Sequence, residues 1–233
     1  MTESARCYRL SAACEALQGR VRWWQVHLDL MREPDAATLQ ALASSERREL
    51  LRLRQREDRV RFAGVRAALR QVLMTEYGLE QTVQIQRDRF GKPTLAMPKP
   101  THGRLAFNVS HAGALGLIAV SYAGQVGVDV EKPIPLDVAC LAEMACTPLE
   151  RDALTKLDAT EGLAAFFRMW VGKEAALKAV GTGIAGGHMP GLSLLDDGSV
   201  RAANMPLPFD PATLKVEPLP VADGYCAAVA LFF

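Results

Sequence analysis

The sequence predicts an α+β fold, and three observations lead to this class. Stretches with an apolar residue at every second position occupy the middle and the end of the chain. Long segments with helical periodicity lie beside them in both halves. The pairs Asp197-Gly198 and Asp223-Gly224 each separate two apolar runs and are strong hairpin signals. Helices beside antiparallel hairpins, without regular alternation of strand and helix, are typical of α+β proteins.

Length and composition describe an ordinary globular protein. The chain has 233 residues, enough for one large domain or two of about a hundred residues each. It is 49% apolar and 23% charged, with a net charge of +1. The overall charge therefore favours neither nucleic acid nor a membrane, and any attraction for an anion must come from a local patch.

Cysteine usage and apolar runs indicate a reducing, aqueous compartment. The cysteines are odd in number, scattered and never spaced C-x-x-C, which disfavours a zinc site or a disulfide framework. The longest apolar runs are too short to span a bilayer, and the N-terminus lacks the apolar core of a signal peptide. We expect a cytoplasmic protein that contacts neither membrane nor nucleic acid.

The first half of the chain is expected to begin with a partly ordered lead-in over residues 1–20. Alternation predicts a strand over residues 20–30. Asp35 is placed to cap a short helix over 36–43, and Ser44 or Ser45 a second helix. A long arginine-rich helix then runs to Tyr77, where Gly78 is a natural stop.

The middle of the chain is strand-rich. A strand over 83–87 is followed by a turn over 89–93. Three further strands are expected close together, over residues 105–109, 115–122 and 126–131. We expect the last two to form a hairpin through Ala123-Gly124-Gln125.

The last hundred residues contain two helical segments and two hairpins. The helices are expected over 135–157 and 160–180, the second ended by Gly181. The hairpins pair 192–195 with 200–203, and 214–218 with 225–233. There is no internal sequence repeat and no linker that would separate independent domains.

The strand over 126–131 carries two acids. Its period-2 geometry places Asp129 and Glu131 on one face, opposite Val128 and Val130. Two acids at the end of a strand are commonly just solvated. The alternative is a pair of oxygen ligands for magnesium, which would relieve the repulsion between the two carboxylates.

The helix over 160–180 carries Glu174 and Lys178 one turn apart. A Glu four residues before a Lys is a favourable surface pair, contributing about 0.2–0.5 kcal/mol. If this helix meets the acidic strand, however, three carboxylates and a lysine converge. Such a set suits a divalent cation bound to a phosphate.

Ser110 and His111 lie between two predicted strands, and a loop is where function concentrates. An exposed turn is the ordinary interpretation of such a pair. A hydroxyl and an imidazole can also donate hydrogen bonds to a phosphate. No acid stands at an obvious triad position, so a serine hydrolase is disfavoured.

Residues 46–70 hold nine arginines against four acids. A solvated helix face is the ordinary interpretation. Nucleic-acid binding is a second, but Phe62 is the only aromatic residue there and no nucleic-acid motif is present. A third interpretation is that Arg61, Arg66 and their neighbours bind a phosphate-rich small molecule. The sequence has no dinucleotide fingerprint and no P-loop.

In combination, these motifs resemble the 4'-phosphopantetheinyl transferase superfamily, in particular its monomeric surfactin-synthetase-activating type. The resemblance covers residues 21–233. The matching stretches, in chain order, are Phe90-Gly91-Lys92-Pro93, Phe107-Asn108-Val109-Ser110-His111-Ala112-Gly113, Gly127-Val128-Asp129-Val130-Glu131 and Trp170-Val171-Gly172-Lys173-Glu174-Ala175-Ala176-Leu177-Lys178. Val171-Gly172 departs from the larger polar pair that is frequent in the family.

The resemblance implies two similar α+β halves related by a pseudo-twofold axis, residues 21–115 and 116–233, with coenzyme A bound in the cleft between them. It implies magnesium ligands and coenzyme A contacts. The implied metal ligands are Asp129, Glu131 and Glu174. The implied coenzyme A contacts are Lys92, Ser110, His111, Lys178 and Arg61, with Arg47 or Arg66 as less clear matches.

The activity implied is transfer of the phosphopantetheine arm of coenzyme A to a serine of an acyl- or peptidyl-carrier protein. Magnesium would bridge the pyrophosphate, and the carrier serine would attack the β-phosphorus. Lys178 and His111 would add positive charge, and Glu174 or a metal-bound water would take the proton. We name Glu174, Lys178 and Asp129 as the catalytic residues.

Overall fold

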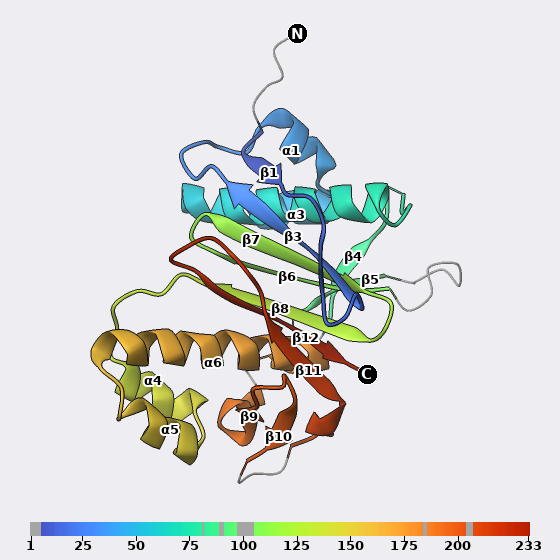
Figure 1. The fold of residues 1–233 in the computed structure, drawn as a ribbon. Helices are drawn as coiled ribbons and strands as arrows, with labels where there is room; N and C mark the ends of the chain where they lie inside the picture. The colour runs from blue at the N-terminus through green and yellow to red at the C-terminus, as the bar shows by residue number, and fades with distance from the viewer. Residues whose placement is uncertain (1–5, 81, 89–90, 97–104, 184–185, 204–206) are drawn as a thin grey trace.

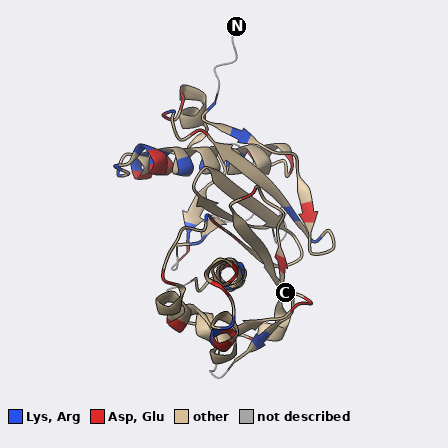
Figure 2. Cartoon of the chain, turned by 60° about the vertical axis from the view of Figure 1, so that its left-hand side comes forward, with Lys and Arg blue, Asp and Glu red and all other residues tan. Residues whose placement is uncertain are grey.

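The computed structural model describes residues 6–80, 82–88, 91–96, 105–183, 186–203 and 207–233. It has an α+β fold in which helices pack on antiparallel sheets, as predicted (Figure 1). The long helix α3 covers one sheet, and the long helix α6 covers a second sheet at the other side of the molecule. The two sheets lie between these helices (Figure 1 and Figure 2).

The N-terminal sheet has the strand order β1-β3-β7-β6, and β2 also pairs with β3. All its pairings are antiparallel. The strands are β1 (Tyr8–Leu10), β2 (Cys14–Ala16), β3 (Val21–Leu28), β6 (Ala106–Ala112) and β7 (Leu115–Ser121). The segment expected to be a partly ordered lead-in therefore contains two strands, which short length and weak alternation concealed.

Strand β7 is buried on both faces, which explains its uninterrupted apolar sequence. Ile118 and Val120 contact the core beneath α3, which is helix Arg56–Thr75. Leu117 and Ala119 point the other way, into the core shared by the two sheets. Because the side chains alternate, one strand serves two cores.

Two short helices precede α3, as predicted; Asp35 caps the first, but the second has Ala43 at its N-cap, so the cap expected at Ser44 or Ser45 is wrong. In α1 (Ala36–Ala41) the carboxylate of Asp35 accepts a hydrogen bond from the backbone N–H of Thr38 at 2.9 Å. In α2 (Ser44–Leu50) the side chain of Glu46 accepts one from the N–H of Ala43 at 2.8 Å. A separate small hairpin, β4 (Ile85–Arg87) and β5 (Pro93–Leu95), lies beside this half.

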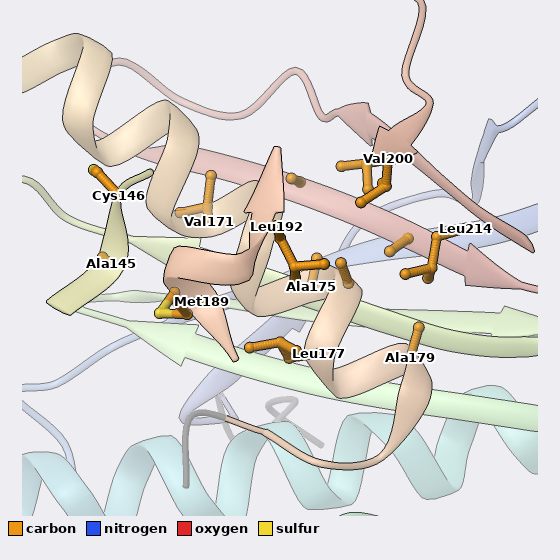
Figure 3. Close-up of a cluster of buried hydrophobic side chains, with 14 of the residues drawn as sticks. Ala145, Cys146, Val171, Ala175, Leu177, Ala179, Met189, Leu192, Val200 and Leu214 are labelled. Atoms are coloured by element: carbon orange, nitrogen blue, oxygen red, sulfur yellow. The ribbon is translucent and has the colours of Figure 1, made fainter. Parts of the chain in front are cut away.

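The C-terminal sheet has the order β11-β12-β8 and is antiparallel. Helix α6 (Ala159–Val180) lies between this sheet and a layer of smaller elements, and Figure 3 shows their shared core. The strands are β8 (Gln125–Glu131), β11 (Leu214–Pro218) and β12 (Cys226–Phe232). The smaller elements are α4 (Val138–Ala145), α5 (Pro148–Leu154), η3 (Met189–Gly191), β9 (Leu192–Leu194), β10 (Val200–Ala202) and η4 (Pro211–Thr213). Both predicted C-terminal hairpins are confirmed.

The hairpin predicted between β7 and β8 is wrong. Strand β7 pairs with β3 and β6, whereas β8 pairs with β12. The turn after Ser121 therefore carries the chain from one sheet into the other. The sequence of the turn looks the same in either case, because turn residues do not specify which strands will pair.

Burial also changes the interpretation of α6. Val171 and Gly172 are buried, so the departure from the family pattern lies in the core of this half. Lys173 is completely buried, and its ammonium donates to the carbonyl of Ala145 at 2.8 Å and to Glu150 at 2.5 Å. It therefore joins α6 to α4 and α5 and does not contribute to a polar surface.

Among the described helices, none combines the length and apolar content that a membrane span requires. All five cysteines are free: Cys7, Cys14, Cys140, Cys146 and Cys226.

Candidate active site

The acidic face predicted on β8 is present. Val128 and Val130 enter the core between the sheets, while Asp129 and Glu131 point to the opposite face. Asp129 is 2% exposed and is therefore a buried acid. Burial of a carboxylate is unfavourable without partners, so its surroundings must supply them.

Helix α6 lies directly against β8 at Gly127. A Cβ at this position would overlap the carbonyl oxygen of Ala175 and the backbone nitrogen of Ala179. Only glycine permits so close an approach. This contact brings Glu174 and Lys178 over the acidic face of the strand, as the convergence hypothesis requires.

Lys178 is the centre of the resulting cluster. Its Nζ lies 2.6 Å from Oδ1 of Asp129, 2.9 Å from Oε2 of Glu174 and 3.3 Å from Oγ of Ser110. Burial opposes the charge of the ammonium, but the two carboxylates outweigh it and raise the pKa of Lys178. Glu174 and Lys178 thus form a largely buried pair within this cluster and not an exposed surface pair.

The three carboxylates repel one another. Burial raises the pKa of Glu131 to about 7, and the charges of Asp129 and Glu174 add to this effect. Burial and the charge of Asp129 also raise the pKa of Glu174, although Lys178 opposes the rise. Oδ2 of Asp129 is buried and has no hydrogen-bond partner in the described structure. The cluster holds more negative charge than one lysine neutralises.

These residues contribute to the lining of a cleft of about 390 Å³. Both halves of the molecule contribute to its walls. The lining residues are Phe62, Val65, Arg66, Arg87, Gly91, Pro93, Val109, Ser110, His111, Asp129, Val130, Glu131, Glu174 and Lys178. Six of the eight predicted site residues are therefore brought together.

His111 is exposed, lines the cleft and lies with Ser110 in β6, so the loop expected for these two residues is wrong. Desolvation by the surrounding protein lowers the pKa of His111, and the cations Arg61 and Lys178 lower it further. These effects favour the neutral imidazole when the cleft holds no phosphate. The neutral ring can donate one hydrogen bond, and its contribution of positive charge to a bound phosphate stays a prediction.

Arg61 and Lys92 are near the cleft but do not line it. Arg61 donates to the carbonyl of Gly113 at 2.8 Å and pairs with Asp58 at 2.9 Å. It thus holds the turn that follows His111. Lys92 donates to the carbonyl of Ala179 at the end of α6 at 3.3 Å, and burial lowers its pKa to about 8.

Arg66 and Arg87 are the two arginines that line the cleft. Arg66 is buried, pairs with Glu46 at 3.3 Å and lies over the ring of Phe62, yet its Nη1 has no partner in the described structure. The sequence analysis named Arg66 only as an alternative coenzyme A contact. It missed Arg87, which its position just before the Gly91-Lys92-Pro93 turn could have indicated. Arg47 faces elsewhere, donating to backbone carbonyls of Gln40 and Leu42.

The chain matches two family models over adjoining segments. Residues 31–123 match the 4'-phosphopantetheinyl transferase N-terminal model, and residues 125–230 match the 4'-phosphopantetheinyl transferase superfamily model. The chain is 36% identical to the 4'-phosphopantetheinyl transferase HetI of Nostoc sp. over 72% of each chain. The chain belongs to the 4'-phosphopantetheinyl transferase superfamily. The resemblance identified from the motifs is thereby confirmed, and with it the enzyme class.

Two further relatives support this membership of the phosphopantetheinyl transferases. A phosphopantetheinyl transferase of Thraustochytrium sp. is 31% identical over 94% of this chain and 79% of its own length. A putative 4'-phosphopantetheinyl transferase of Synechocystis sp. is 37% identical over 64% of this chain and 61% of its own. The boundary between the two family models falls at residue 124, in the turn that carries the chain from β7 to β8.

Proposed function

We propose that this transferase moves the 4'-phosphopantetheine arm of coenzyme A to a serine of an acyl- or peptidyl-carrier protein and releases 3',5'-ADP. The observation that carries the proposal is a cleft whose lining includes two chemically different groups of side chains. Three carboxylates lie around Lys178 in one group, and Arg66 and Arg87 form the other. A ligand with separated phosphate groups is complementary to such a cleft.

The group of three carboxylates fits a magnesium ion that binds together with the phosphates of the ligand. Across the described residues, no set of three or more His, Cys, Asp and Glu side chains forms a ready-made metal cage. Mg²⁺ does not require one, because it commonly takes one or two protein carboxylates together with substrate phosphates. The buried, unpartnered Oδ2 of Asp129 and the crowded charges of Glu131 and Glu174 support the fit.

Asp129, Glu131 and Glu174 would hold the ion. When bound, it would neutralise the negative charge of the pyrophosphate and of the leaving group. Lys178 remains charged and stands between these carboxylates and Ser110. Its ammonium is thus placed to stabilise a phosphate oxygen in the same part of the cleft.

The arginines would bind the second phosphate group of coenzyme A. Arg66 is buried, forms an ion pair with Glu46 and keeps an unpartnered N–H at the cleft wall. Guanidinium groups bind phosphate through paired hydrogen bonds, and a preorganised group loses little entropy on binding. We expect loss of the 3'-phosphate, as in dephospho-coenzyme A, to weaken binding to the parent protein more than to an Arg66→Met variant.

The transfer step needs no nucleophile from this chain. The hydroxyl oxygen of the carrier serine attacks the β-phosphorus, a new O–P bond forms, and the bond from that phosphorus to 3',5'-ADP breaks. Glu174, whose pKa is raised by burial, is the proposed acceptor of the serine proton. The neutral imidazole of His111 would orient a phosphate oxygen by donating a hydrogen bond.

Intact-mass spectrometry tests the proposal. An apo carrier protein is incubated with this transferase and coenzyme A, with magnesium or with a chelator. The expected result is a gain of one phosphopantetheine arm on the carrier serine, only when magnesium is present. Coenzyme A binding without transfer to several unrelated carriers would indicate an inactive binding module and contradict the proposal. Transfer that persists in the presence of chelator would show that the reaction does not require magnesium.

A further inference from the structure

The two sheets meet edge to edge at β6 and β8, and no backbone ladder joins these strands. Strand β6 ends the N-terminal sheet, and β8 ends the C-terminal sheet. An unpaired strand edge leaves N–H groups that need acceptors, above all when it is buried. At this junction the acceptors are side chains.

Two side chains of β6 replace the missing backbone partners. Oδ1 of Asn108 accepts from the N–H of Val128 at 3.0 Å, and Oγ of Ser110 accepts from the N–H of Val130 at 3.4 Å. Both pairs advance by two residues, so the strands run in the same direction with a fixed register. Asn108 is only 3% exposed, which makes its bond hard for water to replace.

Asp129 lies between Val128 and Val130, whose N–H groups donate to the side chains of β6. Its carboxylate reaches Ser110 and Lys178 through the same oxygen, Oδ1, at 2.9 and 2.6 Å. Ser110 therefore both supports β8 and contacts the active-site cluster. Asn108 does not line the cleft and contacts none of the cluster's side chains through a described hydrogen bond.

We propose that Asn108 is a positioning residue, which holds β8 in the register that directs the Asp129 carboxylate to Lys178 and Ser110. The expected effect of Asn108 on catalysis rests on the proposed function. The expected effect of Asn108 on the position of β8 does not. Without the amide oxygen, the buried N–H of Val128 has no acceptor and β8 can move away from β6. A displacement of about 1 Å in a catalytic group can cost on the order of 100-fold in rate.

The experiment compares Asn108→Ala with Asn108→Ser, which keeps an uncharged oxygen acceptor like that of Ser110. Ser121→Ala is the matched control, because Ser121 is also 3% exposed, and its Oγ donates to Arg20 at 2.8 Å and accepts from Ala123 at 3.0 Å, outside the cleft. Two quantities are measured: amide hydrogen exchange of Val128 and Val130 without ligands, and kcat and KM for coenzyme A. If Asn108→Ala does not fold, Asn108→Leu replaces it, since leucine has the shape of asparagine without an acceptor.

For Asn108→Ala we expect faster exchange at Val128, a kcat lowered by about 10- to 100-fold and a KM changed by less than about threefold. Asn108→Ser should recover part of the loss, and Ser121→Ala should leave kcat unchanged. Unchanged exchange at Val128, or a kcat that falls equally in the control, overturns the proposal. An inactive parent protein would contradict the proposed function, while the exchange data would still decide whether Asn108 holds the strand.

Discussion

Lys173 and Glu174 are adjacent on α6 but belong to two separate networks. Lys173 donates to Ala145 and Glu150 and fixes α4 and α5 against the helix. Glu174 accepts from Lys178 at 2.9 Å on the side that faces the cleft. Since neighbouring helical residues point about 100° apart, one helix anchors its own half and builds the active site.

Lys173→Met should destabilise the protein by about 3 kcal/mol, because it leaves Glu150 partly buried without its cation. Denaturant unfolding measures the loss. The double variant Lys173→Met with Glu150→Gln is the control and should recover part of it, since no uncompensated charge remains. Equal stability of the parent and the single variant would show that the pair is not important for folding.

Asp129→Asn should lower transfer by at least about 100-fold while the protein stays folded. The substitution removes a ligand of the proposed metal and the nearest negative charge to Lys178, and it also relieves repulsion among the carboxylates. The measurement is initial rate of carrier modification, with circular dichroism as the check on folding. Undiminished transfer would exclude Asp129 from the chemistry.

Gly127→Ala should cost about 1–3 kcal/mol and reduce transfer, because the added methyl group would overlap backbone atoms of α6. Gly172→Ala is the matched comparison. There the new methyl group would meet the side chain of Leu194, which can move more easily than backbone. Thermal unfolding and the transfer rate of both variants test the difference, and a larger effect at Gly172 would contradict it.

Lys92→Met should make the folded state more stable at pH 7 than in the parent. Burial lowers the pKa of Lys92 to about 8 from an ordinary value of 10.5, so folding is penalised while the ammonium is charged. The penalty is present below about pH 8 and disappears as the pH rises toward 10.5. The free energy of unfolding of the two proteins should therefore converge over this range; a constant difference would contradict the assignment.

Most of the fold was predictable because local signals agree with the tertiary structure. The cap at Asp35, the stop at Gly181 and the two Asp-Gly hairpins all have local causes. The pairing of β8 with β12 was not predictable, since nearly a hundred residues separate them, and neither the alternation of β8 nor the continuous apolar run of β12 specifies a partner. The two N-terminal strands were too short for periodicity to detect.

The residues of the candidate site likewise divide into those that local spacing predicts and those whose position depends on the tertiary structure. Spacing places Asp129 with Glu131, and Glu174 with Lys178, on single faces, so convergence needed only the contact of one strand with one helix. Arg61 and Lys92 were predicted from their positive charge and from the resemblance, neither of which fixes where a long side chain points, and both bond to backbone carbonyls outside the cleft lining. The pKa shift of His111 depends on neighbours that only the folded chain supplies.

The junction of β6 with β8 also bears on whether either half can exist alone. A fragment ending near residue 124 would display the free edge of β6, and its complement the free edge of β8, each beside the apolar face formed by residues such as Leu117 or Val229. Such fragments would be prone to self-association when made singly. Produced together, they have matching edges and a common core, so the turn at residue 124 is the natural place to divide this transferase into two complementing pieces.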